Sequence, residues 1–169
     1  DARGVLAITG SQIAPIRKIV IAGSDGSVAR VVDVGSLISV GTFQPNMYEQ
    51  GSVGTSFLVA RTQALPFAET ILIGTSGNAT PSGANRDFNA TGILFGNGTT
   101  TSTEVVIPAG AISVNVVLTP IDDVQGEGDE TITFTVGTTL TYDAGFNFAT
   151  TLVLRDNDTI GGPVVTATS

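Results

Sequence analysis

The sequence predicts an all-β protein built as an antiparallel sandwich, and three observations lead to this fold class. Apolar and Thr residues alternate strictly in residues 131–136, which is the period of a strand with one buried face. Gly, Pro, Asn and Ser separate several short segments of this kind, a spacing typical of sandwiches. Long runs of Ala, Leu, Glu and Lys are absent, so little helix is expected.

The strands expected in the central part of the chain follow from the same pattern. In residues 131–136, the inward positions are Ile132, Phe134 and Val136. A second inward row consists of Ile112, Val114, Val116 and Leu118. The further strand candidates are residues 55–61, 70–75, 92–95, 103–107 and 148–155.

The N-terminal part of the chain has a different organisation. Residues 16–22 and 27–34 flank Gly23-Ser24-Asp25-Gly26, which is a plausible hairpin turn, and residues 5–9 and 37–40 are further strand candidates. This segment is too short for a core of its own, so it is expected to pack onto the main sandwich or to exchange with a neighbouring molecule. The expected division is a β extension over 1–45, a sandwich over 46–159, and a linker or short C-terminal strand over 160–169.

Composition excludes several classes of function. The net charge of -8 argues against binding nucleic acid, which needs Lys and Arg to displace counterions. With no Cys, neither disulfides nor thiolate metal sites can form, and no apolar run of about 18 residues predicts a membrane span. The surface is expected to be Thr-rich with few charges, because charged residues make up only 13% of the chain. Such a surface suits an extracellular or cell-surface protein.

An acidic run is the main chemical feature of the chain. Residues 122–130 hold five carboxylates between two strand patterns, and Asp156 and Asp158 close a later strand. Like charges about 4 Å apart repel by roughly 4 kcal/mol at an effective dielectric near 20. Many hard oxygen ligands without His or Cys favour calcium. The alternative is that these residues are solvated, with Asp and Asn acting as turn formers.

The order of these motifs resembles the Calx-β domain family. The resemblance covers about residues 46–159 and is carried by the combination of pieces, each of which is weak alone. The matching pieces are Tyr48-Glu49-Gln50-Gly51, Ala84-Asn85-Arg86-Asp87-Phe88, Pro108-Ala109-Gly110, Ile121-Asp122-Asp123, Gly128-Asp129-Glu130-Thr131-Ile132-Thr133-Phe134 and Leu154-Arg155-Asp156-Asn157-Asp158.

The resemblance implies a seven-stranded immunoglobulin-like sandwich with calcium ions clustered at one end. The chain departs from the family pattern at Val124, where many members carry a third Asp, and at Arg86, which is placed to compete with an ion for its neighbour. Asp129 is expected to point outward. The implied ligands are the carboxylates of Glu49, Asp87, Asp122, Asp123, Glu127, Glu130, Asp156 and Asp158, with the backbone carbonyl oxygen of Gln125.

An enzyme is not expected, because the chain has no His or Cys for the usual bases and nucleophiles and no Trp to line a sugar cleft. The preferred hypothesis is an extracellular calcium-binding structural module of a bacterial surface, adhesive or filamentous protein. Calcium would rigidify the domain end, and the N-terminal strands would add to a neighbour's sheet. The expected partners are calcium and neighbouring domains or identical subunits. The alternatives are a reversible calcium-sensing domain and a carbohydrate- or protein-binding module.

Overall fold

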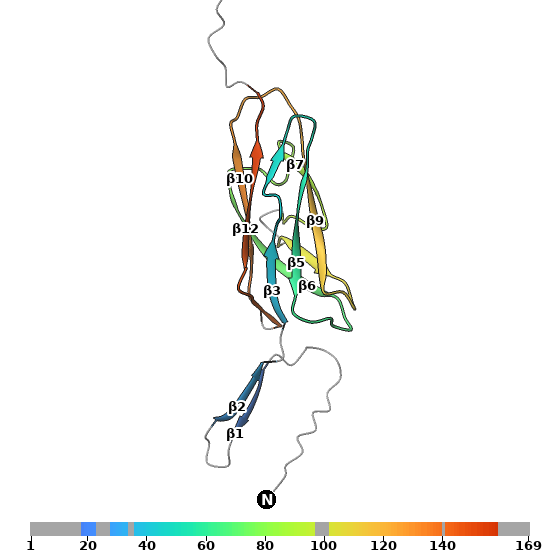
Figure 1. Ribbon diagram of the computed structural model, residues 1–169, viewed down its shortest axis with the longest axis vertical. Helices are drawn as coiled ribbons and strands as arrows, with labels where there is room; N and C mark the ends of the chain where they lie inside the picture. The colour runs from blue at the N-terminus through green and yellow to red at the C-terminus, as the bar shows by residue number, and fades with distance from the viewer. Residues whose placement is uncertain (1–17, 23–27, 34–35, 97–101, 140, 159–169) are drawn as a thin grey trace, which may run out of the picture.

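The computed structural model describes residues 18–22, 28–33, 36–96, 102–139 and 141–158, and the only regular secondary structure in them is β-strand. The strands form two five-stranded sheets and a separate two-stranded hairpin (Figure 1). The expected sandwich is confirmed, with ten strands in its two sheets rather than about seven. No helix within the described ranges is long and apolar enough to cross a membrane.

The first sheet has the strand order β4-β12-β10-β6-β8. Its pairings are antiparallel except that β4 runs parallel to β12. The alternation seen in the sequence buries Ile132 and Phe134, while the outward Thr133 hydroxyl bonds that of Thr151 at 2.8 Å. The strands of this sheet are β4 (Asn46–Tyr48), β6 (Glu69–Gly77), β8 (Glu104–Ile107), β10 (Glu130–Val136) and β12 (Ala149–Arg155).

The second sheet has the strand order β11-β3-β5-β9-β7, with β11 parallel to β3 and the other pairs antiparallel. Strand β3 lies in the segment expected to be an extension, yet it pairs on both sides within this sheet. The second sheet therefore includes residues from Ser36 onward, which is packing of this part of residues 1–45 onto the main sandwich. The strands are β3 (Ser36–Gly41), β5 (Thr55–Arg61), β7 (Phe88–Thr91), β9 (Ser113–Pro120) and β11 (Tyr142–Ala144).

The hairpin expected in the N-terminal segment is present as β1 (Lys18–Ala22) paired with β2 (Val28–Asp33). The strand candidate over residues 5–9 and the C-terminal segment 160–169 lie outside the described residues. The candidate over 92–95 was wrong as a strand, since only Leu94 forms an isolated bridge, to Glu104.

The core between the sheets is organised around aromatic side chains. Phe57 stacks on Phe134 with ring centroids 4.5 Å apart, and Phe95 lies 6.4 Å from Phe134. Phe43 is fully exposed, because it follows β3 where the chain leaves one sheet for the other. Ile112 is 59% exposed, since the inward row of β9 starts after it.

Candidate metal centre

The fold collects acidic residues from five segments at one end of the sandwich, which we call the acidic end. Strands β4, β9 and β12 end there, while β7 and β10 begin there. Each strand terminus carries a carboxylate predicted to be a ligand. These are Glu49 after β4, Asp87 before β7, Asp122 and Asp123 after β9, Glu130 at the start of β10, and Asp156 and Asp158 after β12.

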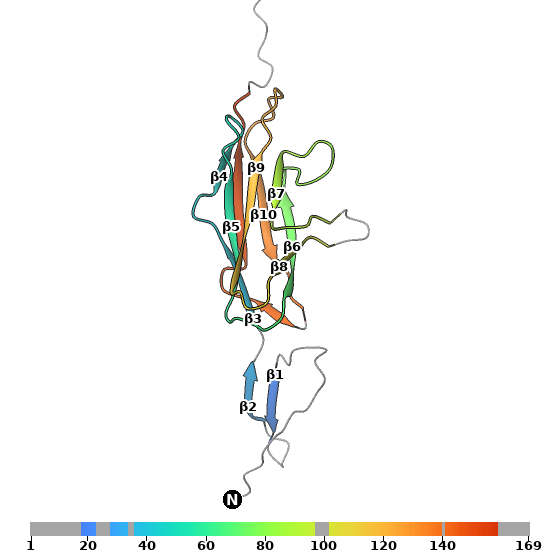
Figure 2. The same ribbon diagram turned by 90° about the vertical axis from the view of Figure 1, so that its right-hand side faces the viewer.

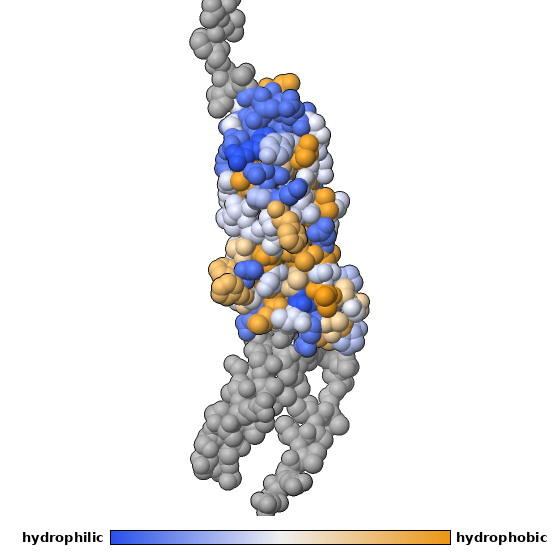
Figure 3. Space-filling model, viewed as in Figure 1, coloured by the Kyte–Doolittle hydropathy of each residue, from blue (hydrophilic) through white to orange (hydrophobic). Residues whose placement is uncertain are grey.

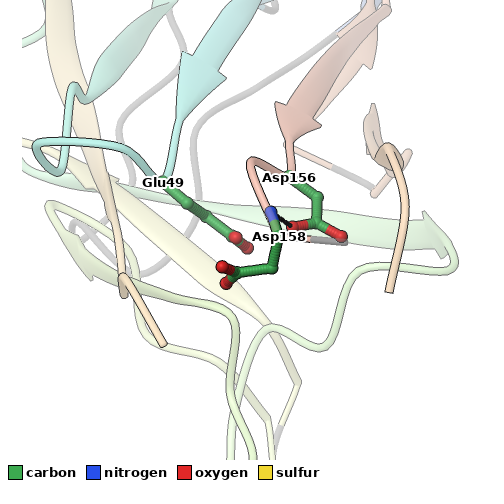
Figure 4. A group of neighbouring side chains, drawn as sticks. All are labelled: Glu49, Asp156 and Asp158. Carbon is green, nitrogen blue, oxygen red and sulfur yellow. Dashed lines mark hydrogen bonds between the residues drawn. The ribbon is translucent and has the colours of Figure 1, made fainter. Parts of the chain in front are cut away.

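A first cluster consists of Glu49, Asp156 and Asp158, whose carboxylate oxygens lie within 4.8 Å of one another. Figure 4 shows the Glu49 carboxylate, from the end of β4, turned toward the two aspartates that follow β12. Glu49 is buried, and its backbone N–H donates to the Arg155 carbonyl at 3.1 Å, which holds the two segments together. The Oδ2 atom of Asp158 is buried and has no hydrogen-bond partner.

A second cluster consists of Asp87, Glu127 and Glu130, again with one oxygen from each within 4.8 Å of the others. Asp87 is fixed by the Thr80 backbone N–H, which donates to its Oδ2 at 2.5 Å. The Oε2 atom of Glu130 is buried without a partner. Each cluster therefore contains one carboxylate oxygen that has lost water and gained no hydrogen bond in exchange.

Crowding and burial make two of the glutamates hard to ionise. Burial, followed by the charges of Asp156 and other neighbouring carboxylates, raises the pKa of Glu49 to about 7. The pKa of Glu130 rises to about 8, first because of burial and then because of its hydrogen bond with Asp87 and the surrounding charges. Glu127 contributes to both shifts, so the two clusters act on each other as one electrostatic site.

The surroundings of Asp156, unlike those of the two glutamates, favour the ionised carboxylate. Its carboxylate accepts the backbone N–H groups of Asp158 at 2.6 Å, Gly128 at 2.5 Å and Glu127 at 2.6 Å, and these donors lower its pKa. The carboxylate thereby ties the loop after β9 to the end of β12. This connection requires no metal, so part of the site is already organised in the protein alone.

The loop after β9 carries the predicted ligands that lie outside both clusters. The Gln125 backbone N–H donates to Asp123 Oδ1 at 2.7 Å, which is the turn-forming role weighed for such residues. The Gln125 side chain donates to Glu127 Oε1 at 2.6 Å. Asp122 and Asp123 are exposed, and both charges raise the pKa of Asp158 after the larger effects of its burial and of Asp156. Their roles as ligands, with that of the Gln125 carbonyl, stay predictions.

No arginine neutralises the clusters in the part of the sandwich that the structure describes. Arg155 pairs with the outward Asp129, as expected for that aspartate. Arg86 was expected to compete for Asp87, but it donates to Asn89 Oδ1 at 3.0 Å and to the Gly83 carbonyl at 3.3 Å instead. Arg61 lies at the other end of β5.

One supporting residue was missed in the sequence. The Asn78 side-chain oxygen accepts the Thr131 backbone N–H at 2.8 Å and its hydroxyl at 3.1 Å. This bond fixes the start of β10 next to Glu130, at the edge of the second cluster. The only sequence signal was a Gly-Asn pair, which marks a turn but not its target.

No protein-family model matches the chain, and no curated protein matches it in sequence. Among solved structures, it is similar to CBD12 from CALX1.2, with 14% identity over 72% of this chain and 45% of that chain and a TM-score of 0.44. It is also similar to the calcium binding domain CBD12 of CALX1.1, with 17% identity over 68% of this chain and 42% of that chain and a TM-score of 0.47. A third similar structure is the apo-form Calx CBD1 domain, with 14% identity over 72% of this chain and 99% of that chain and a TM-score of 0.46. The chain spans less than half the length of the two CBD12 structures.

Proposed function

We propose that the acidic end binds calcium and that the domain is an extracellular structural module stiffened by the bound ions. The observation that carries this proposal is the pair of buried oxygens without partners, Glu130 Oε2 and Asp158 Oδ2, each inside a carboxylate cluster. An unpaired buried acceptor is unfavourable, and more so when it is charged. A hard divalent cation supplies the missing partner and neutralises the neighbouring charges together.

The donor set fits calcium in kind and in number. In the proposal, Glu49, Asp156 and Asp158 hold one ion, and Asp87, Glu127 and Glu130 hold a second. Calcium takes six to eight oxygens, and carboxylates bind it with one or both of theirs. Further oxygens are available from Asp122, Asp123, the Gln125 carbonyl and water.

A structural role is favoured over a sensing role by the bonds of Asp156. Its three backbone hydrogen bonds already join the loop after β9 to the end of β12, so ion binding has little loop rearrangement left to drive. Bound ions would instead lock five strand termini together. They would also fix Asp158, the last described residue before the C-terminal segment, and so stiffen the connection to whatever follows.

The extracellular assignment is supported by composition. The surface strands are rich in Thr, charged residues make up 13% of the chain, and a metal takes the stabilising place that disulfides hold in many secreted domains. Extracellular calcium modules bind in the range of about 10⁻⁴–10⁻³ M, which suits a site saturated outside the cell. Labelling intact cells with an antibody against this domain tests the location, and a signal that appears only after lysis would contradict it.

Calorimetric calcium titration, with thermal melting in calcium and in chelator, tests the binding proposal. We expect heat of binding and a melting temperature that rises with calcium concentration, by an amount equivalent to about 2.7 kcal/mol at a hundredfold excess over Kd. Magnesium at the same concentration should have a much smaller effect, because it demands a compact octahedral shell. The Asp129→Asn variant is a matched control, since Asp129 pairs with Arg155 outside both clusters. Identical melting curves in calcium and chelator would contradict the proposal.

A further inference from the structure

The β1–β2 hairpin is a two-stranded sheet that pairs with neither sheet of the sandwich (Figure 2). Its register pairs Val20 with Val31 and Ile19 with Val32, so apolar residues occupy both alternating sets of positions. An isolated two-stranded hairpin is only marginally stable in water. This hairpin therefore needs an apolar surface to pack against.

The hairpin cannot extend a sheet beside β3 of its own molecule. Only two residues separate the end of β2 from the start of β3, which keeps the hairpin close to this strand. Both hydrogen-bonding edges of β3 are in use, because β11 pairs with Ser36–Ile38 and β5 pairs with Ile38–Gly41. A neighbouring molecule can offer a surface without these constraints.

The outer face of β3, β5 and β9 offers a suitable apolar groove. A hollow of about 270 Å³ is lined by Ser39, Val40, Gly41, Thr42, Phe43, Leu58 and Ala60. A hollow of about 500 Å³ adjoins it at Phe43 and extends to Val117. None of the described residues that line either hollow is charged. In Figure 3, hydrophobic residues gather where Figure 1 labels β3 and β5, and hydrophilic residues gather toward the other end of the sandwich. We call these two hollows the Phe43 groove.

The distribution of charge favours a second copy of this chain as the partner. Residues 1–35 carry four basic and three acidic groups, a net charge of +1, whereas residues 36–158 carry three basic and twelve acidic groups, a net charge of -9. Two sandwiches repel each other, whereas residues 18–33 of the hairpin carry two basic and two acidic groups, a net charge of zero, and meet no net repulsion from the sandwich of another molecule. When a hairpin docks in the groove, none of the groove residues named above is a charged group that would have to give up its contact with water.

We propose that the β1–β2 hairpin of one molecule docks in the Phe43 groove of a second copy. The contact is head to tail. The hairpin of one molecule occupies the groove of the next, so the first molecule's groove and the second molecule's hairpin stay free for further copies. Such a contact continues into an open chain of molecules unless the geometry closes a ring. The proposal deepens the structural role proposed above by naming the partner, and it does not depend on calcium.

Two complementary variants of the full chain test this proposal. Val20→Glu places a charge in the hairpin and leaves the groove intact, whereas Leu58→Glu places a charge in the groove and leaves the hairpin intact. Leu58 is 39% exposed on the outer face of β5, so the second change does not disturb the core. Val106→Glu is the matched control, because Val106 is 43% exposed on β8 in the other sheet.

Masses are measured by sedimentation from micromolar to millimolar protein, in chelator and again in calcium. The wild type and Val106→Glu should form species that grow beyond a dimer, and each of the two test variants alone should stay monomeric. Their equimolar mixture should form a dimer and stop there, because only one intact hairpin meets one intact groove. Phe43→Ser, at a fully exposed position, should reproduce the loss caused by Leu58→Glu.

A wild type that stays monomeric throughout, or a mixture that never forms the dimer, would overturn the proposal. Loss of association in Val106→Glu but not in Leu58→Glu would also overturn it, because that result would show that the contact lies on β8 in the other sheet. The two proposals fail independently. Association that persists without any calcium binding would leave the docking standing and contradict the metal site alone.

Discussion

At the scale of single residues, Asp156 and Glu130 belong to the same acidic end but are held in opposite ways. Asp156 accepts three backbone N–H groups, so its charge is stabilised by the protein itself. Glu130 has a buried oxygen without a partner and a pKa of about 8, so its charge is opposed by its surroundings. In our account Asp156 organises the loop and Glu130 depends on an ion, and substitutions at the two positions should behave differently.

Substitution Glu130→Gln should separate calcium binding from folding. The amide removes a poorly tolerated charge, so we expect the melting temperature in chelator to stay the same or to rise. In calcium, the loss of a charged ligand should weaken binding about tenfold or more, which is about 1.4 kcal/mol. Melting in both conditions, together with calorimetry, measures the two effects. A large loss of stability in chelator would show that Glu130 stabilises the fold without a metal.

Substitution Asp156→Ala should lower stability with or without calcium. It leaves the backbone N–H groups of Glu127, Gly128 and Asp158 without their protein acceptor, so all three bonds to the Asp156 carboxylate, two of them from the loop after β9, are lost. Chemical denaturation in chelator measures the free energy of unfolding directly. An unchanged value there would mean that the hydrogen bonds of Asp156 do not organise the loop.

At the scale of elements, the end of the sandwich opposite the acidic end contains its own cation. Arg61, at the end of β5, is buried and donates to the carbonyls of Ala111 and Pro108, each at 2.9 Å. It also pairs with the buried Glu69 at the start of β6, at 3.4 Å. This guanidinium holds the loop after β8 and the start of β6 together. At the acidic end, a metal ion would hold strand termini together in a comparable way.

Substitution Arg61→Met should destabilise the protein equally in calcium and in chelator. The variant leaves Glu69 buried without its partner, a change that typically costs about 3–5 kcal/mol, and it removes the donor to the carbonyls of Ala111 and Pro108. The calcium affinity of the folded variant should match that of the wild type, because Arg61 contacts neither carboxylate cluster. A loss of stability confined to calcium would contradict this division between the two ends.

The sequence was most informative where an element's own pattern decides its structure. The alternation in residues 131–136 predicted β10 and its inward side chains, because that strand is central and buries one face. Strands β4, β7 and β11 have only three or four residues and form through pairing with neighbours, so no local period marks them. The fold brings six of the carboxylates named from motif order into two clusters, but the turn role of Asp123 and the direction of Arg86 depend on loop conformations that no local pattern specifies.

At the scale of the whole molecule, the sandwich is a negatively charged body whose most strained charges lie at one end. Glu49 and Glu130 hold protons more tightly in the folded protein, with pKa values of about 7 and about 8, than at the ordinary value of 4.5. Between the ordinary pKa of 4.5 and the raised values of about 7 and about 8, the folded state binds more protons than the unfolded chain. The free energy of unfolding of the metal-free protein therefore falls as the pH rises.

Stability in chelator should consequently be highest near pH 5 and should decline up to about pH 8. The contribution of these two glutamates is fully present below about 4.5 and is lost as the pH passes through 7 and 8. Calcium competes with protons for the same oxygens, so the gain in melting temperature from calcium should increase over this range. Melting curves at several pH values, with and without calcium, measure both trends. A metal-free protein that becomes more stable between pH 5 and pH 8 would contradict the assignment of strained carboxyls.

A crystal structure determined from millimolar calcium tests the metal site most directly. We expect ions at about 2.3–2.6 Å from oxygens of Glu49, Asp156 and Asp158, and from oxygens of Asp87, Glu127 and Glu130. We also expect Glu130 Oε2 and Asp158 Oδ2, the buried oxygens without partners within the two clusters, to be among the ligands. Carboxyl groups that contact only water and one another in that crystal would contradict it.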